Sequence, residues 1–316
     1  MITPLPEKDS RSIAAFLRRC LIAGIFSIGY LALSFVLIGF KPDQITLITL
    51  FSVCYIATKT TRRFIIGFSI YIVYWIIFDY MKAFPNYNYN AVHIESIYNF
   101  EKSIFSVYSN QTLLTFNEYC KQFATPFLDV ICGLFYLSWV PVPLAFSAYL
   151  FFKRRIAFFH FALTFFLVNL IGFVIYYIYP AAPPWYVQQH GFQFIANTPG
   201  NVGGLERFDH FFNIRLFHGM YEKNSNVFAA MPSLHSAFPV IVLFHGIKNQ
   251  YKYINIFFAI IMLGIWFAAV YTSHHYVVDV LAGITCAITA IIVYEKVLLK
   301  TKWFNQFINA YMKVTE

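Results

Sequence analysis

Charged side chains are scarce in this chain. Only 12% of its 316 residues are Asp, Glu, Lys or Arg, whereas 59% are hydrophobic and 21% are aromatic. A soluble domain of this length needs far more charge to cover its surface, so the composition excludes an ordinary soluble protein. The net charge of +9 does not indicate a nucleic-acid partner, because the topology of a membrane protein explains it better.

Cysteine is also sparse, and its few positions show no paired spacing. The five are Cys20, Cys54, Cys120, Cys132 and Cys286. This pattern excludes a disulfide framework and a cysteine-rich zinc site. Most of the five lie inside apolar runs, where a thiol behaves as a small buried hydrophobic group.

What the chain does contain is a series of eight apolar runs. They lie near residues 20–40, 45–58, 64–81, 127–151, 156–179, 231–247, 254–271 and 277–299. All but the short second run have the length that a helix needs to cross a bilayer. We therefore predict an all-α, polytopic membrane protein with about eight transmembrane helices. The first run has no convincing small-residue cleavage site, so we expect no cleavable signal.

The basic residues favour one side of the membrane. With eight spans, sixteen of the 23 Lys and Arg residues fall on one side, in the tails and short loops. The other seven are spread over much longer loops. The positive-inside rule then predicts that both termini are cytoplasmic. The expected organisation is a cytoplasmic tail (1–19), a single integral-membrane domain (20–299) and a second cytoplasmic tail (300–316).

Two long segments, 82–126 and 180–230, are predicted on the outer side. The first has Ile94, Ile97, Tyr98 and Phe105 at helical spacing, with Glu95, Glu101 and Lys102 mostly off that face. This pattern is typical of a helix that lies in the membrane interface. The second segment is aromatic, and we expect an ordered lid or wall in which Trp185 and Tyr186 anchor the interface.

Histidines stand at the outer ends of two spans, in AAMPSLHSAFP (229–239) and YTSHHYVVDVLAG (271–283). His275 and Asp279 are four residues apart, so on a helix they share one face. A carboxylate there would fix the imidazole tautomer and leave the other ring nitrogen free to attack. His235 would then donate and accept the proton on the opposite side of a reacting phosphorus.

Simpler interpretations compete with this one. A single interfacial histidine is commonly a snorkelling polar group, and the His275–Asp279 pair is compatible with a structural hydrogen bond. Two histidines and one aspartate could also hold a metal ion, but no further carboxylate or cysteine accompanies them. An ionisable residue within a span is costly to bury, which favours a functional role.

The same residues carry a resemblance to a known family. PSLH (232–235) and HYVVDVLAG (275–283) resemble the second and third motifs of the type 2 phosphatidic acid phosphatase superfamily. Further segments resemble its inositol phosphorylceramide synthase branch, namely TRRF (61–64), PNY (85–87), YPAAPPWY (179–186), GLERFD (204–209) and VFAAMPSLHSA (227–237). Their ordered succession is more specific than any one of them.

The resemblance implies a six-helix catalytic bundle and a mechanism without a metal or other cofactor. His275 would be the nucleophile that takes the phosphoryl group of a lipid, and Asp279 would orient it. His235 would protonate the departing diacylglycerol oxygen and later deprotonate the incoming alcohol. The product would be a headgroup moved between lipids through a phosphohistidine.

The sequence departs from the phosphatase pattern at three places. Ala269 stands six residues before His275, where the phosphatases carry an arginine; YPAAPPWY has no basic residue; and Leu234 replaces a glycine. Fewer fixed cations weaken the hold on a dianionic phosphomonoester, since bidentate arginine contacts are the strong ones. A phosphodiester has one negative charge, so the departures favour headgroup transfer over phosphatidate hydrolysis.

Four residues near these motifs are candidates for substrate binding. Arg207 and Asp209 are the first choices for phosphate or inositol contacts, with the alternative that they pair with each other and order the loop. Ser233 is expected to donate to a phosphoryl oxygen or to cap the sixth span. His274 is expected to touch the substrate or to face water.

The sequence supports one main hypothesis and two alternatives. The first is a transferase that moves phosphoinositol from phosphatidylinositol to ceramide at the periplasmic surface of a bacterial inner membrane, or at the lumenal surface of a Golgi membrane. Phosphatidylethanolamine or phosphatidylcholine are alternative donors, and dihydroceramide is an alternative acceptor. The second is a phosphatase of phosphatidate or a polyprenyl diphosphate. The third is a non-enzymatic membrane protein with a degenerate site.

Overall fold

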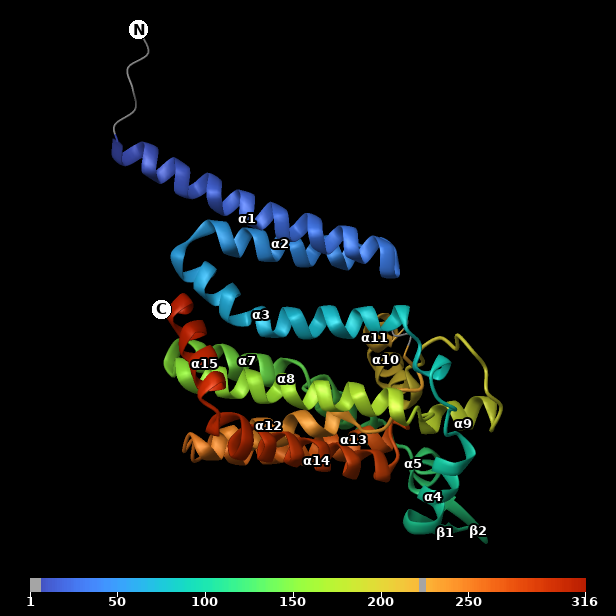
Figure 1. Cartoon of the computed structure of the whole chain (residues 1–316). Helices are drawn as coiled ribbons and strands as arrows, with labels where there is room; N and C mark the ends of the chain where they lie inside the picture. The colour runs from blue at the N-terminus through green and yellow to red at the C-terminus, as the bar shows by residue number, and fades with distance from the viewer. Residues whose placement is uncertain (1–6, 222–225) are drawn as a thin grey trace. The chain divides into compact units, whose positions relative to one another are not determined.

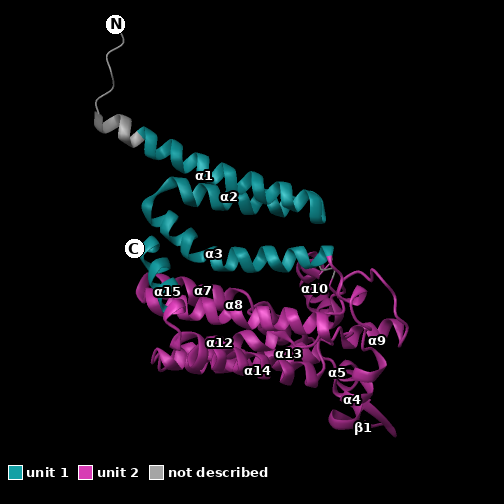
Figure 2. Cartoon of the chain, viewed as in Figure 1, with its two compact units in different colours: residues 1–83, 305–316 teal, residues 84–304 magenta. Residues whose placement is uncertain are grey.

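The computed structural model describes residues 7–221 and 226–316, and these are mostly helical (Figure 1). Residues 1–6 of the predicted N-terminal tail lie outside the described residues. The chain divides into two compact units, Met1–Ala83 with Asn305–Glu316 and Phe84–Phe304 (Figure 2). The all-α class predicted from the apolar runs is confirmed.

The first unit contains three consecutive helices, α1 (Glu7–Ile38), α2 (Pro42–Ala57) and α3 (Lys59–Tyr80), then the turn η1 (Met81–Ala83). Helix α2 packs against both α1 and α3. The unit also includes most of α15 (Lys302–Thr315), where the Tyr311 hydroxyl donates to the carbonyl of Ile66 on α3. This contact ties the C-terminal helix to the third helix within the unit.

The second unit contains the remaining elements. In chain order they are η2 (Asn86–Asn88), α4 (Glu95–Phe105), β1 (Ser106–Ser109), β2 (Thr112–Thr115), α5 (Phe116–Gln122), α6 (Pro126–Leu137), α7 (Pro141–Lys153), α8 (Arg155–Ile178), α9 (Pro184–His190), η3 (Gly203–Leu205), α10 (Glu206–Phe212), α11 (Leu216–Tyr221), α12 (Leu234–Lys248), α13 (Ile254–Tyr271), α14 (Val277–Ile292), η4 (Val293–Val297) and η5 (Leu298–Lys300). The two strands form one antiparallel hairpin.

Each of the eight predicted runs coincides with helix. Among the described residues, six helical segments are long and apolar enough to cross a membrane. The other two, α2 and α12, are apolar helices of 16 and 15 residues. The chain is therefore a multi-pass membrane protein, and the predicted shortness of its second run is confirmed.

The fourth apolar run is not one continuous helix. Helix α6 ends at Leu137 and α7 begins at Pro141. Proline has no amide hydrogen, so Pro141 cannot donate the helical hydrogen bond back to the carbonyl of Leu137, although Val140 before it keeps helical dihedral angles. The sequence therefore contains the reason for the break, although hydropathy alone predicts a single span.

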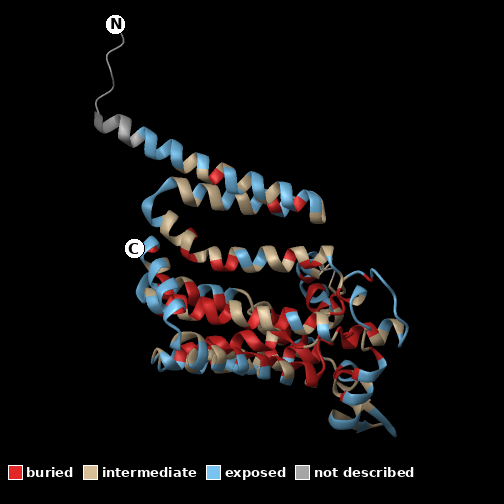
Figure 3. Ribbon diagram, in the orientation of Figure 1, coloured by how far each residue is buried: buried red, intermediate tan, exposed pale blue. Residues whose placement is uncertain are grey.

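The core of the second unit lies where α12 packs against α8, α13 and α14. Figure 3 shows buried residues concentrated along these helices. Two glycines allow the close approach. A Cβ on Gly172 of α8 would lie 2.7 Å from the Leu234 side chain, and one on Gly283 of α14 would lie 2.1 Å from the carbonyl oxygen of Ser233.

The outer segments contain helices, but three of their residues differ from expectation. Helix α4 forms as predicted, yet Glu101 is fully buried rather than on a solvated face. Trp185 and Tyr186 are buried as well, so the prediction that they anchor the interface is wrong. The Tyr186 hydroxyl donates to the carbonyl of Gln193, and the Tyr186 ring packs on Phe228, because the segment folds into its own small core.

Candidate active site

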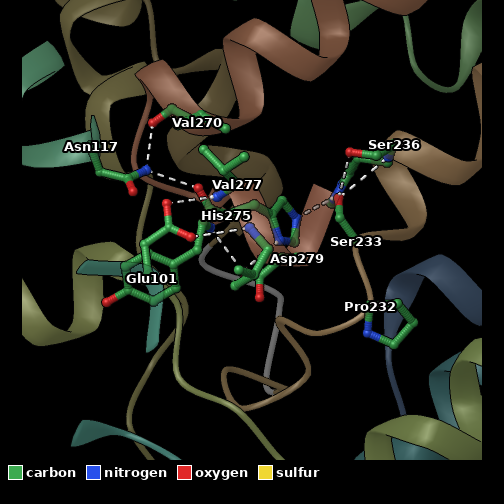
Figure 4. A network of polar contacts seen from close by, with 12 residues as sticks. Glu101, Asn117, Pro232, Ser233, Ser236, Val270, His275, Val277 and Asp279 are labelled. Carbon is green, nitrogen blue, oxygen red and sulfur yellow. Dashed lines mark hydrogen bonds and ion pairs between the residues drawn. The ribbon is translucent and has the colours of Figure 1, made fainter. Parts of the chain in front are cut away.

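The start of α12 holds His235 beside the start of α14. Ser233 caps α12: its hydroxyl accepts hydrogen bonds from the amide and the hydroxyl of Ser236, at 3.3 and 3.1 Å. Its own amide donates to the carbonyl of Asp279 at 2.9 Å. Ser233 therefore acts as the cap of α12, which was one of its two predicted roles. Its amide also links the start of α12 to α14 (Figure 4).

His275 lies in the turn between α13 and α14, two residues before α14 begins. The prediction that it shares a helical face with Asp279 is therefore wrong, although the two side chains still meet. The amide of His275 donates to the carbonyl of Ala269, which closes the turn after α13. Asp279, in the first turn of α14, accepts from the amide of Tyr276 at 2.8 Å and so caps its own helix.

Three predicted residues come together from these two places. His235 Nδ1 lies 3.1 Å from His275 Nε2, within hydrogen-bond range. On the other side of the same ring, His275 Nδ1 lies 3.6 Å from Asp279 Oδ2, an ion-pair distance that is long for a hydrogen bond. Asp279 is fully buried and His275 is 5% exposed, whereas His235 is partly open.

The surroundings of His235 are aromatic. The ring of Trp139 packs edge-on to it at 4.5 Å between centroids, and that of Tyr136 lies at 5.1 Å. The neighbouring residue Leu234 contacts Gly172, which precedes the end of α8 at Ile178 by six residues. This contact brings the start of α12 against α8.

His274 faces away from the histidine pair. Its Nε2 lies 2.9 Å from the carbonyl oxygen of Val202, and its ring stacks with Tyr136 and Tyr221. Burial lowers the pKa of His274 to about 3, and the neighbouring His275 acts in the same direction. A neutral imidazole that donates to Val202 holds the 202–204 loop against the turn, and because His274 is buried, the alternative that it faces water is wrong.

Arg207 approaches the same turn from α10. Its Nε donates to Asp129 of α6 at 2.6 Å, and its guanidinium lies over the ring of Tyr271. A Cβ on Gly204 would lie 3.0 Å from both of its terminal nitrogens. One of these, Nη2, is buried and has no hydrogen-bond partner among the described residues. The alternative that Arg207 pairs with Asp209 is wrong.

Asp209 instead forms hydrogen bonds with the backbone of α11. Its carboxylate accepts from the amides of Phe217 and His218 at 3.1 and 3.0 Å, and it is 2% exposed. These bonds give Asp209 a role in folding the outer loop.

Two residues that the sequence analysis did not select hold the backbone around His275. The amide nitrogen of Asn117 on α5 donates to the carbonyls of Val270 and His275. The carboxylate of Glu101 on α4 accepts from the first amides of α14 (Figure 4). No pattern in the neighbouring sequence predicts either contact, because each joins positions more than 150 residues apart.

No three His, Cys, Asp or Glu side chains within residues 7–221 and 226–316 gather closely enough to form a metal site. Two histidines in contact, one of them against a buried carboxylate, are instead suited to nucleophilic attack with proton transfer.

Comparison with known proteins gives a consistent result. The model of the PAP2 superfamily matches residues 110–293. The chain is 42% identical to phosphoinositol dihydroceramide synthase of Bacteroides thetaiotaomicron, over 89% of this chain and 93% of that protein. It is 27% identical to inositol phosphorylceramide synthase of Candida albicans, over 85% of this chain and 57% of that protein.

A third relative is matched over a shorter region. The catalytic subunit of inositol phosphorylceramide synthase of Saccharomyces cerevisiae is 35% identical over 37% of this chain and 29% of its own length. No solved structure matches the chain.

Proposed function

The chain belongs to the PAP2 superfamily and is a membrane phosphotransferase, and we propose that it moves phosphoinositol from phosphatidylinositol to ceramide or dihydroceramide. The observation that carries the proposal is the 3.1 Å contact between His235 and His275, with Asp279 on the far side of His275. The 42% identity to a bacterial phosphoinositol dihydroceramide synthase supports the choice of headgroup.

The ring contacts support one arrangement of protons before substrate binds. A proton on His275 Nδ1 faces the Asp279 carboxylate, which leaves a lone pair on His275 Nε2. His235 Nδ1 must then be the donor in the contact between the rings. The lone pair of His275 and the proton of His235 therefore face each other, and a phosphorus that enters between the two rings would have the nucleophile on one side and the acid on the other.

The reaction then proceeds in two displacements. His275 Nε2 attacks the phosphorus, the bond from phosphorus to the diacylglycerol oxygen breaks, and that oxygen takes a proton from His235 in its imidazolium form, which leaves a neutral imidazole as the base for the second step. The first products are diacylglycerol and phosphoinositol bound to His275. In the second step His235 removes the proton of the ceramide hydroxyl, whose oxygen attacks phosphorus and breaks the phosphorus–nitrogen bond.

We assign Arg207 to the phosphate of the donor lipid. Its Nη2 is a donor without a partner among the described residues, and Gly204 lets the guanidinium lie close to the 272–274 turn. One guanidinium with a free donor suits a singly charged phosphodiester. It occupies the role that an arginine at position 269 would have in the phosphatases, where this chain has a buried alanine.

We also propose that this site faces the outer side of a bacterial inner membrane, with both termini in the cytoplasm. The distribution of basic residues supports this orientation, and the bacterial relative supports the compartment. All residues proposed to act lie within Phe84–Phe304.

To test this, purified protein is incubated with phosphatidylinositol labelled in the inositol ring, with and without ceramide or dihydroceramide, and the labelled products are separated. Label on the sphingolipid, absent from His275→Ala, would support both the transfer and its nucleophile. Release of label to water without transfer would overturn the proposal, as would turnover of phosphatidate alone, and both would favour a phosphatase.

A further inference from the structure

The backbone carbonyl of His275 accepts a hydrogen bond from an amide side chain of α5. Asn117 Nδ2 donates to the carbonyl of Val270, the penultimate residue of α13, at 2.7 Å, and to the carbonyl of His275 at 2.8 Å. Asn117 is fully buried. Because both amide hydrogens are used, the group joins the end of one helix to the main chain of the nucleophile.

The start of α14 is held from α4 by a carboxylate. Glu101 accepts from the amide of Val277 at 3.0 Å through Oε1 and from that of Val278 at 3.1 Å through Oε2. The first amides of a helix have no partner within the helix, and a negative charge there complements the helix dipole. These two amides follow His275 by two and three residues, so the carboxylate fixes the chain immediately after the nucleophile.

The turn needs such support because His275 is not part of a helix. Its amide bonds to the carbonyl of Ala269, but its carbonyl is held by Asn117, a side chain from another part of the sequence. The imidazole must keep one nitrogen toward His235 and the other toward Asp279. A small rotation of the backbone at position 275 would break both relations together.

We propose that Asn117 and Glu101 are positioning residues for the phosphoryl-accepting histidine. The outer segment α4–α5 is then a brace that fixes the His275 backbone from behind, without contacting the lipid substrates. This inference rests on the proposed function, in which His275 is the nucleophile. It gives α4 a role in positioning His275, in addition to the interfacial location expected from its sequence.

The first test replaces Asn117 by aspartate, which keeps the shape but removes both donors. The structure offers a matched control in Asn86, whose Nδ2 also donates to two backbone carbonyls, those of Tyr176 and Phe228, both at 2.9 Å. It is equally buried, but its bonds do not reach the 270–279 segment. The substitutions Asn117→Asp and Asn86→Asp therefore carry similar structural costs.

We expect Asn117→Asp to lower kcat for headgroup transfer by about 10- to 100-fold, the effect of a nucleophile displaced by roughly 1 Å. The KM values of both lipids should stay within about twofold, because the brace lies behind the histidine. Asn86→Asp should retain most of its kcat when assayed well below its unfolding temperature.

The second test replaces Glu101 by glutamine. Glutamine keeps one acceptor oxygen, but its NH2 group would face a backbone N–H, so two donors would meet. Glu95→Gln is its control, since Glu95 lies exposed on the same helix. Glu101→Gln should show the same fall in kcat at constant KM, and Glu95→Gln should not. The wild-type protein and His275→Ala are assayed in parallel with all four variants.

These assays separate the two proposals. Absence of transfer by the wild-type protein would contradict the proposed function itself. Transfer by the wild type with an unchanged kcat in Asn117→Asp and Glu101→Gln would overturn the brace alone. Equal losses in Asn117→Asp and Asn86→Asp would also overturn it, because the effect would then be one of general stability.

Discussion

At the scale of single residues, Arg207 combines two tasks on one guanidinium. Its Nε is held by Asp129, while Nη2 has no partner among the described residues. Lysine would keep the charge but not the planar group that serves both tasks. We expect Arg207→Lys to reduce kcat/KM for phosphatidylinositol by about 10- to 100-fold, which corresponds to the loss of a charge-assisted hydrogen bond.

The measurement for this prediction is the initial rate at several donor concentrations. Arg154→Lys is a suitable comparison, because Arg154 stacks on Tyr251 and donates to the carbonyl of Asn249, away from the histidines. If Asp129→Asn lowers activity as much as Arg207→Lys does, with KM unchanged in both, the ion pair serves structure and the phosphate contact is refuted.

Glu101 should make stability depend on pH. Burial raises the pKa of its carboxyl from 4.5 to about 7, the charge of Asp279 adds to this rise, and the amides of Val277 and Val278 oppose it. Because the folded pKa is the higher one, this group stabilises the fold fully below pH 4.5. Its contribution is lost as pH rises toward 7.

Thermal unfolding between pH 4.5 and 8 tests this expectation. The Tm of the wild-type protein should fall relative to that of Glu101→Gln as pH rises through the range, because glutamine does not titrate. Glu95→Gln should follow the wild-type curve. Parallel curves for wild type and Glu101→Gln would contradict the raised pKa.

At the scale of elements, the contact between α12 and α14 sets the distance between the two histidines. A Cβ on Gly283 would lie 2.1 Å from the Ser233 carbonyl oxygen, which is backbone and cannot rotate away. We expect Gly283→Ala to lower stability by about 1–3 kcal/mol, the usual cost of overpacking. It should also reduce transfer, since Ser233 caps α12, which carries His235 in its first turn.

Gly24→Ala on α1 is the control for Gly283→Ala, because a Cβ there would meet nothing within 4 Å. Thermal unfolding and transfer are measured for both variants. Alanine is the better helix former, so Gly24→Ala should be neutral or slightly stabilising. An equal effect of the two substitutions would show that helix propensity, rather than the contact, is responsible.

Much of the fold at this scale could be predicted from the sequence. Hydropathy locates each apolar helix, since length and composition decide whether a segment suits a membrane. The break at Val140 was missed because an average over a run ignores Pro141, although the proline itself is visible. The location of Trp185 and Tyr186 was also missed, because a belt residue and a core residue have the same composition.

The candidate site was predictable only in part. His235, His275 and Asp279 belong to short motifs, and the fold brings them together as the motifs suggest. Asn117 and Glu101 belong to no motif, and their partners lie more than 150 residues away in the chain. A long-range contact of this kind leaves no trace in periodicity or charge pattern.

At the scale of the whole molecule, the orientation across the membrane determines which leaflet supplies the substrates. The excess of Lys and Arg in the tails and in one set of loops predicts cytoplasmic termini, and so an outer location for the helix ends that carry His235 and His275. Cysteine labelling in intact cells tests this directly. Tyr108 of the β1–β2 hairpin is 72% exposed, which makes Tyr108→Cys a reporter for the outer side.

Lys313→Cys is the reporter for the side of the membrane on which the C-terminus lies. Three of the five native cysteines are buried, so labelling of the protein without an added cysteine is a sufficient control. A membrane-impermeant maleimide should label Tyr108→Cys in intact cells and Lys313→Cys only after permeabilisation. The reverse pattern would place the site in the cytoplasmic leaflet and contradict the proposed orientation. Labelling of both in intact cells would mean an even number of crossings between them instead of five, so one of the five proposed spans, of which α12 is the shortest, would not cross the membrane.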